Sequence, residues 1–140
     1  MEWEFLQRIL LKIGLPEEWV NLSMETVCTA SYSTLINGEA KVFITPSQGI
    51  KQGDPLSPYL FLLCAGGLSS LIRRAMENQQ LRGELSCNGG VKLSHLLFTD
   101  DNLLFCEATT AKCRNLIDIL ESYERASSQA INRQKTHTLF

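Results

Sequence analysis

HLLFTDDNLLFC, residues 95–106, is the most informative segment of the chain. Two apolar runs of strand-like length flank the polar residues between Thr99 and Asn102, which predicts a β-hairpin with Asp100 and Asp101 at its tip. Carboxylate oxygens suit Mg²⁺, which proteins bind through one or two carboxylates together with substrate phosphates. The alternative for the same residues is a solvated Asp-Asp turn, because acids are common in turns.

Length and composition indicate one modest globular domain. The chain has 140 residues, of which 44% are hydrophobic and 20% charged. No apolar run reaches about 18 residues, so we expect no membrane span. The acidic start, without a basic segment before an apolar one, favours neither a secretory signal nor a transit peptide.

The cysteines and the net charge bear on the redox compartment of the protein and on whether it binds nucleic acid by itself. The five cysteines lack zinc-ligand spacing, so we expect reduced, mostly core thiols in an intracellular protein. The nucleus, the cytoplasm and an organelle such as the mitochondrion stay open as its location. The formal net charge of −2 argues against a free-standing nucleic-acid-binding domain, which usually carries a basic excess. A nucleic-acid role would therefore depend on local basic clusters or on further protein.

The first third of the chain predicts two helices and a hairpin. Apolar residues recur at helical spacing over 3–13, Gly14 is a suitable stop, and a second helix follows over about 17–29. Asn37-Gly38 between two apolar runs is a strong signal for a second β-hairpin over 31–45.

A shaped loop is predicted over 47–58, where two glycines and two prolines precede an apolar helix over about 57–78. Glycines let the backbone approach a ligand closely, and the free N–H groups of the following helix favour anions. An ordinary loop explains the same residues equally well. The first half of the helix should be buried and its last turns, which begin at Arg73 and Arg74, exposed.

The remaining segments complete an α+β pattern. We expect a loop over 79–90, a hairpin over 91–106 that helices cover on both faces, a helix over 110–127 and a final strand over 136–140. For His95, packing or hydrogen bonding is favoured over catalysis because no partner is evident in the sequence. The predicted fold is an antiparallel sheet with helices packed on one face.

Three stretches carry a specific resemblance. Residues 52–61 (QGDPLSPYLF), 98–101 (FTDD) and 127–135 (SSQAINRQK) resemble, in order, three motifs of reverse transcriptases. The most similar class is that of the LINE-like (non-LTR) retrotransposons of plants, and residues 2–6 and 32–38 resemble it too. The intron-associated, maturase-like reverse transcriptases are a nearby alternative.

The resemblance implies a partial reverse transcriptase domain over 1–140, with part of the fingers and an incomplete, ferredoxin-like polymerase palm. The first palm motif, the thumb and an endonuclease domain would lie outside these residues. The implied partners are an RNA template, a DNA primer and a deoxynucleoside triphosphate, with no membrane, and the implied cofactor is Mg²⁺ or Mn²⁺. The implied catalytic metal ligands are Asp100 and Asp101, and the implied nucleotide-binding residues are Gln52, Gly53, Asp54, Pro55 and Lys135.

Two positions depart from the family pattern. Thr99 stands where the family usually has alanine before the Asp pair. Ser128 stands where the family commonly has glycine, and if that position needs a positive φ, the serine costs about 1 kcal/mol.

The family's first motif supplies a third carboxylate, which has no counterpart in these 140 residues. We therefore expect that the isolated chain does not polymerise DNA, because a lost ligand would weaken metal binding and misplace the nucleophile. One alternative is a non-catalytic remnant or a domesticated module that binds RNA or protein, which salt-dependent RNA retention would support. Another is a poorly folded product without function, which a broad thermal melt would favour.

Overall fold

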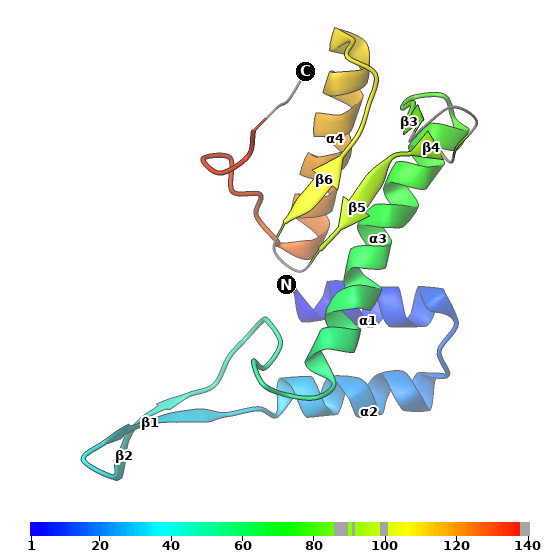
Figure 1. Cartoon of the computed structure of the whole chain (residues 1–140). Coiled ribbons are helices and arrows are strands. Elements are labelled where there is room, and N and C mark those ends of the chain that lie inside the picture. Colours follow the sequence, from blue (N-terminus) through cyan, green and yellow to red (C-terminus); the bar gives the residue numbers. More distant parts are fainter. Residues whose placement is uncertain (86–89, 91, 99–100, 138–140) are drawn as a thin grey trace. The chain divides into compact units, whose positions relative to one another are not determined.

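The computed structural model describes residues 1–85, 90, 92–98 and 101–137 (Figure 1). The chain divides into two compact units, Met1–Leu63 and Cys64–Phe140. Among the described residues, four helices accompany three two-stranded antiparallel sheets. The α+β class is therefore confirmed. The expectation of a single sheet is wrong for the described residues, because none of the three strand pairs is hydrogen-bonded to another.

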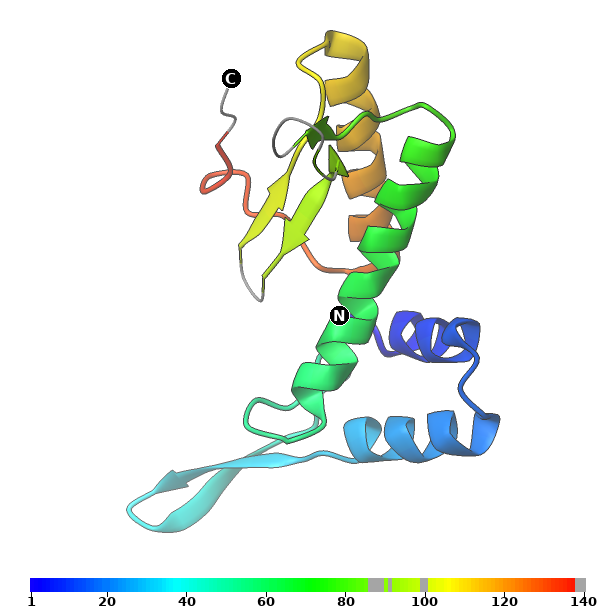
Figure 2. The ribbon, with the colours of Figure 1, turned by 45° about the vertical axis from the view of Figure 1, so that its right-hand side comes forward.

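Two predicted helices open the first unit. Helix α1 spans Trp3–Ile13 and helix α2 spans Glu17–Cys28, and the two pack against each other (Figure 2). Gly14 ends α1 with φ +93°, where its N–H donates to the last carbonyls of the helix. The buried apolar side chains of the pair are Leu6, Leu10, Val20 and Val27.

The first hairpin also follows the prediction. Strand β1 (Tyr32–Ile36) pairs with β2 (Glu39–Ile44), and the turn residues Asn37 and Gly38 both have positive φ, at +54° and +83°. Two positive φ values define the tight turn whose twist matches that of the flanking strands. The pairing slips by one residue after Thr34, and every residue of both strands is exposed.

Helix α3 spans Ser57–Glu77 and runs from the first unit into the second (Figure 1). Its buried residues recur every three or four positions over the whole length, which corrects the expectation that only the first half is buried. They are Leu60, Cys64, Leu68, Ile72 and Ala75. By length and composition alone α3 could also cross a membrane, so the absence of a membrane span remains a prediction.

The second unit contains the remaining strands and helix α4 (Thr110–Ser127), whose bounds match the prediction. Strand β3 (Glu84–Leu85) pairs with β4 (Lys92–Leu93), which corrects the expectation of a loop throughout 79–90. Gly83 permits this pairing, because a Cβ there would lie 2.5 Å from the carbonyl oxygen of Leu93.

The central hairpin consists of β5 (His95–Leu97) and β6 (Asn102–Leu104), which lie alongside the second half of α3 and α4 (Figure 2). Leu96 and Leu103 are 41% and 50% exposed. The expectation that helices cover both faces of this hairpin is therefore wrong, because alternate residues of a strand point to opposite faces and these two remain open. The expected final strand is not formed at 136–137, and residues 138–140 lie outside the described part of the chain.

Helix α4 ends as its sequence suggests. Ser128 has φ +53°, so this position does need the left-handed conformation that the family usually assigns to glycine. Upstream of it Tyr123 is buried, and its hydroxyl oxygen lies 3.2 Å from the carbonyl oxygen of Cys64. Ser127, also buried, donates to the carbonyl of Tyr123.

We predict that Ile72→Ala lowers the free energy of unfolding by about 2–5 kcal/mol, because it leaves a cavity at a side chain that is 1% exposed. The matched control is Ile117→Ala on α4, where the side chain is 53% exposed and the change should stay within about 0.5 kcal/mol. Urea unfolding followed by circular dichroism measures both. Equal losses in the two variants would contradict the burial described for α3.

Candidate functional site

Asp101 lies directly before β6, at the turn between the two strands of the central hairpin. Its carbonyl oxygen accepts the Phe98 N–H at 3.1 Å, and the pairing of Leu97 with Asn102 closes the turn. The residue is exposed, and its carboxylate forms no ion pair with any residue that the structure describes. Asp100, the other acid of the predicted pair, lies outside the described residues, as does Thr99.

The donor chemistry at this turn fits a hard divalent cation. Asp101 offers carboxylate oxygens to solvent, and such oxygens are the ligands that Mg²⁺ prefers. Within the described ranges, no three His, Cys, Asp or Glu side chains gather to form a complete metal site. A metal at this turn would therefore draw on Asp101 together with groups beyond those described, such as water, substrate phosphates or Asp100.

The predicted nucleotide loop lies in the first unit and contains two short turns, at Gln52-Gly53 and at Pro55-Leu56. Gln52, Gly53 and Pro55 are exposed, and Gly53 has φ +82°, a conformation that favours glycine. Asp54 is half-buried, and its Oδ1 accepts the Leu56 N–H at 2.8 Å while its carbonyl accepts the Ser57 N–H at 3.2 Å. The Asp54 carboxylate therefore shapes the entry into α3, a local role that the sequence alone did not reveal.

This loop is also tied to the start of the chain. The indole Nε1 of Trp3 donates to the Gly49 carbonyl at 2.7 Å, and the Gly49 N–H donates to the Met1 carbonyl at 2.8 Å. The second of these bonds involves a glycine with φ +90°. Helix α1 thus holds the loop that carries Gln52 to Pro55.

Lys135 lies on a turn after α4 in the second unit. Asn132 organises this turn, because its Oδ1 accepts the N–H groups of Gln134 at 3.1 Å and Lys135 at 3.3 Å. The Lys135 side chain is exposed and has no ion pair with a described residue. Its ammonium is available to an anion from solution.

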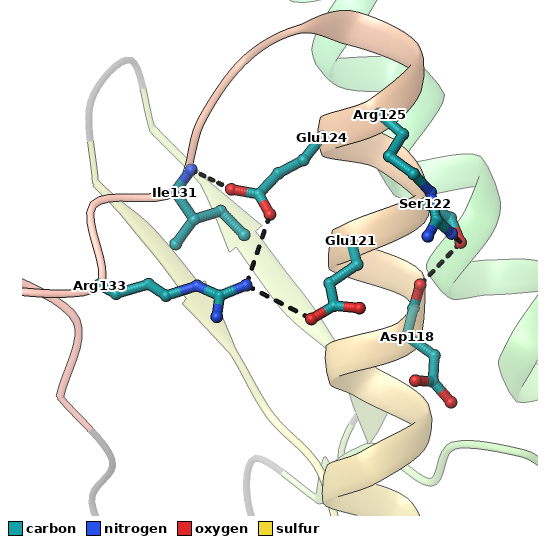
Figure 3. A network of polar contacts seen from close by, with 7 residues as sticks. All are labelled: Asp118, Glu121, Ser122, Glu124, Arg125, Ile131 and Arg133. Atoms are coloured by element: carbon teal, nitrogen blue, oxygen red, sulfur yellow. Dashed lines mark hydrogen bonds and ion pairs between the residues drawn. The ribbon is translucent and has the colours of Figure 1, made fainter.

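A polar network upstream of Lys135 was not found from the sequence (Figure 3). The Glu124 carboxylate accepts the Ile131 N–H and lies 3.9 Å from the guanidinium of Arg133, which also lies 3.3 Å from Glu121. The only signal in the sequence was mixed charge at helical spacing, which usually means a solvated helix face. The contacts depend on the reversal of the chain at Ser128, which spacing within a helix does not predict.

His95 connects the central hairpin to α3. Its Nε2 lies 2.8 Å from the Ser69 hydroxyl and its Nδ1 lies 2.8 Å from the Ser94 hydroxyl, which confirms the interpretation of His95 as a hydrogen-bonding residue. Burial lowers the pKa of His95 below its ordinary value, and the positive charge of Arg73 lowers it further. Neutral imidazole is therefore the favoured form in the folded protein.

Three other groups in the second unit have a raised pKa, which favours their neutral forms. Burial raises the pKa of the Cys64 thiol to about 11 and that of the Tyr123 hydroxyl to about 12. Burial, followed by the neighbouring Cys113, also raises the pKa of Cys106. The four described cysteines form no disulfide, and none of these shifts gives an activated nucleophile.

Comparison with known proteins identifies the class to which this hairpin and its acidic turn belong. The family model for reverse transcriptase (RNA-dependent DNA polymerase) matches residues 1–140. The chain therefore belongs to the reverse transcriptase family, as its three motifs indicated.

Among the individual relatives are one uncharacterised plant protein and two retrotransposon polyproteins. An uncharacterised mitochondrial protein of Arabidopsis thaliana is 49% identical over 75 residues, which are 54% of this chain and 62% of that protein. The Pol polyprotein of the type-1 retrotransposable element R2 from Popillia japonica is 28% identical over 128 residues, 91% of this chain and 20% of the polyprotein. The R2 polyprotein of Nasonia vitripennis is 35% identical over 97 residues, 69% of this chain and 9% of the polyprotein. The chain thus spans less than two thirds of the length of each of these relatives, and the resemblance to non-LTR elements is confirmed.

We predict that His95 makes the second unit less stable as the pH falls from about 7 to about 5. Because the folded-state pKa of His95 lies below the ordinary value of about 6.5, the unfolded chain binds the proton more tightly. The stability contributed by neutral His95 is complete above about pH 6.5 and is lost as the pH falls toward the folded-state pKa.

Urea unfolding of the native chain and of His95→Gln at both pH values measures this effect. The glutamine variant keeps hydrogen-bonding groups for the two serines but cannot titrate, so it should lose less stability between the two pH values. An equal loss in both proteins would contradict the assignment.

Proposed function

We propose that this chain carries part of the nucleotide- and metal-binding centre of an RNA-directed DNA polymerase. The observation that carries the proposal is the exposed Asp101 carboxylate directly before β6 in the β5–β6 hairpin, in a chain whose residues 1–140 match the reverse transcriptase family. Both units would be parts of one reverse transcriptase domain, and the second unit would supply the hairpin of a ferredoxin-like palm.

In this proposal Asp100 and Asp101 hold the divalent cation. A bound Mg²⁺ or Mn²⁺ supplies positive charge that favours the ionised primer hydroxyl and offsets the charge of the triphosphate. The protein's part is to keep the Asp101 carboxylate exposed at a turn fixed by β5–β6 pairing, so that the ligand is in place before the substrate arrives.

Lys135 would provide the matching positive charge for the nucleotide. Its ammonium is exposed on a turn whose backbone Asn132 organises, which suits contact with the triphosphate as a point charge. The loop from Gln52 to Pro55 would shape the pocket for the nucleotide and template, with Gly53 allowing the backbone to approach them closely.

The proposed partners are an RNA template and a DNA primer. The formal net charge of −2 is low for a protein that holds nucleic acid alone, so these partners would also need basic surface on further protein. The proposed location is intracellular, in the nucleus, the cytoplasm or the mitochondrion.

The metal assignment is tested with Mn²⁺, whose unpaired electrons broaden the NMR signals of nearby amides. We expect Mn²⁺ to broaden the amide signals of Phe98, Asp101 and Asn102 first. In Asp101→Asn the same broadening should need at least about ten times more Mn²⁺, because one charged ligand is lost. The matched control is Asp118→Asn, which removes an exposed acid of α4 and should leave the effect unchanged. Broadening that is the same in Asp101→Asn and in the native chain would contradict the proposal.

The isolated 140 residues should not extend a DNA primer on a poly-A RNA template with Mg²⁺ or Mn²⁺. The reason is the missing third carboxylate, since small misplacements of reacting groups can cost about 100-fold in rate. Gel analysis of a labelled primer measures the extension. Extension that disappears in Asp100→Asn would show that these residues suffice and would overturn this prediction.

A further inference from the structure

The chain reverses direction at the end of α4, and side chains of α4 fix the reversal. Ser128 adopts φ +53° and donates its N–H to the Glu124 carbonyl at 2.8 Å. The hydroxyl of Tyr123, a side chain only 7% exposed, donates to Oε1 of Gln129 at 2.7 Å. The first residue after the turn is therefore anchored to a buried group and not only to the helix end.

Glu124 then holds the next part of the returning segment (Figure 3). One carboxylate oxygen accepts the Ile131 N–H, and the other lies 3.9 Å from the Arg133 guanidinium. The Glu124 side chain is 20% exposed, whereas that of Arg133 is 73% exposed. A hydrogen bond from a backbone amide to a largely buried carboxylate is stronger than an ion pair to an exposed arginine, so the bond to Ile131 is the main restraint.

The turn that carries Lys135 follows at once. Asn132 sits between the two residues that contact Glu124, and its Oδ1 and carbonyl oxygen both accept the Lys135 N–H, at 3.3 and 3.1 Å. The carbonyl of Asn132 also accepts the Thr136 hydroxyl at 2.9 Å. A restraint on Ile131 and Arg133 is therefore a restraint on the base of this turn.

We propose that Glu124 is a positioning residue for Lys135, which it serves by holding the backbone at Ile131 and Arg133 against α4. The inference rests on the proposed role of Lys135 as a ligand of the triphosphate. An ordinary helix end needs contacts only at the cap, but here the carboxylate reaches residues seven and nine positions further on. Holding the segment in advance lowers the entropy lost when a flexible lysine meets an anion.

Two measurements on the same variants test this role. Amide hydrogen exchange reports whether Glu124 holds the segment, and titration with deoxyadenosine triphosphate and Mg²⁺ by calorimetry reports the binding of the nucleotide. Glu124→Ala should speed exchange at the Ile131 and Lys135 amides about tenfold and weaken triphosphate affinity about fivefold. Glu124→Gln keeps an acceptor for the Ile131 N–H without the charge. Its amide exchange rates and its triphosphate affinity should lie between those of the native chain and those of Glu124→Ala.

The matched control is Glu121→Ala, because Glu121 contacts the same arginine but makes no contact with the Ile131 amide. This variant should stay within about twofold of the native chain in both measurements. In a Lys135→Ala background, Glu124→Ala should cause no further loss of affinity, since its effect on binding passes through the lysine. A thermal melt shows whether each variant is folded. If Glu124→Ala is not folded, the comparison is made between the native chain and Glu124→Gln.

The outcomes separate the inference from the proposed function. If the native chain binds the triphosphate and Lys135→Ala weakens it but Glu124→Ala does not, the positioning role is wrong while the proposed function stands. Unchanged amide exchange in Glu124→Ala overturns the positioning role in the same way. If the native chain shows no triphosphate binding, the proposed role of Lys135 fails and the inference fails with it.

Discussion

The second unit depends on one buried hydroxyl. Tyr123 of α4 is buried, and its hydroxyl oxygen lies within hydrogen-bond distance of two acceptors, the Cys64 carbonyl of α3 and Oε1 of Gln129, which share its single proton. An unpaired hydroxyl in that place would cost the full penalty of losing water, so these partners have to be present when the unit folds. A single group thus connects α3, α4 and the returning segment, and the burial that keeps it neutral also keeps it a donor at every physiological pH.

Charged side chains in this protein fall into two kinds: those that are hydrogen-bonded within the chain, and those that are exposed and could bind a ligand. The Glu124 carboxylate is largely buried and satisfied by the chain, and the half-buried Asp54 carboxylate caps the entry into α3. Asp101 and Lys135 are exposed, on turns whose backbones are hydrogen-bonded. An exposed charge on a hydrogen-bonded backbone is the arrangement expected where a cation or an anion is to be bound with little reorganisation.

The sequence predicted the helices and the hairpin whose bounds depend on residues close together in the chain. The helices 3–13 and 110–127 have the predicted bounds because the signals that fix them act within a few residues. These signals are the apolar periodicity, Gly14 at the end of α1, and Thr109, whose side-chain oxygen accepts the Lys112 N–H at the start of α4. Asn37-Gly38 gave the first hairpin because few other pairs adopt two consecutive positive φ values at low cost. For Ser128 the sequence raised a positive φ only as a condition, from the glycine that the family commonly has there, and the structure meets that condition.

Strand pairing, burial and side-chain contacts that join segments far apart in the chain could not be predicted from local sequence patterns. The pairing of β3 with β4 spans too few residues for a periodic signal, and burial along all of α3 depends on which segments pack on it. Within the candidate site, the sequence identified Asp101 and Lys135 by motif but missed Glu124, because its contacts with Ile131 and Arg133 exist only after the chain has turned back. Asp100 lies outside the described residues, so its predicted role is untouched by the structure.

The exposure of both faces of the first hairpin has a consequence for how the protein opens. Alternate residues of a strand point to opposite faces, so Leu35 and Phe43 fall on one face of the pair and Val42 and Ile44 on the other. Neither face of this exposed pair is buried, and an isolated two-stranded hairpin is at best marginally stable in water. The strands can therefore separate while α1 and α2 stay folded, which makes the hairpin a local opening unit whose stability is lower than that of the helices beside it.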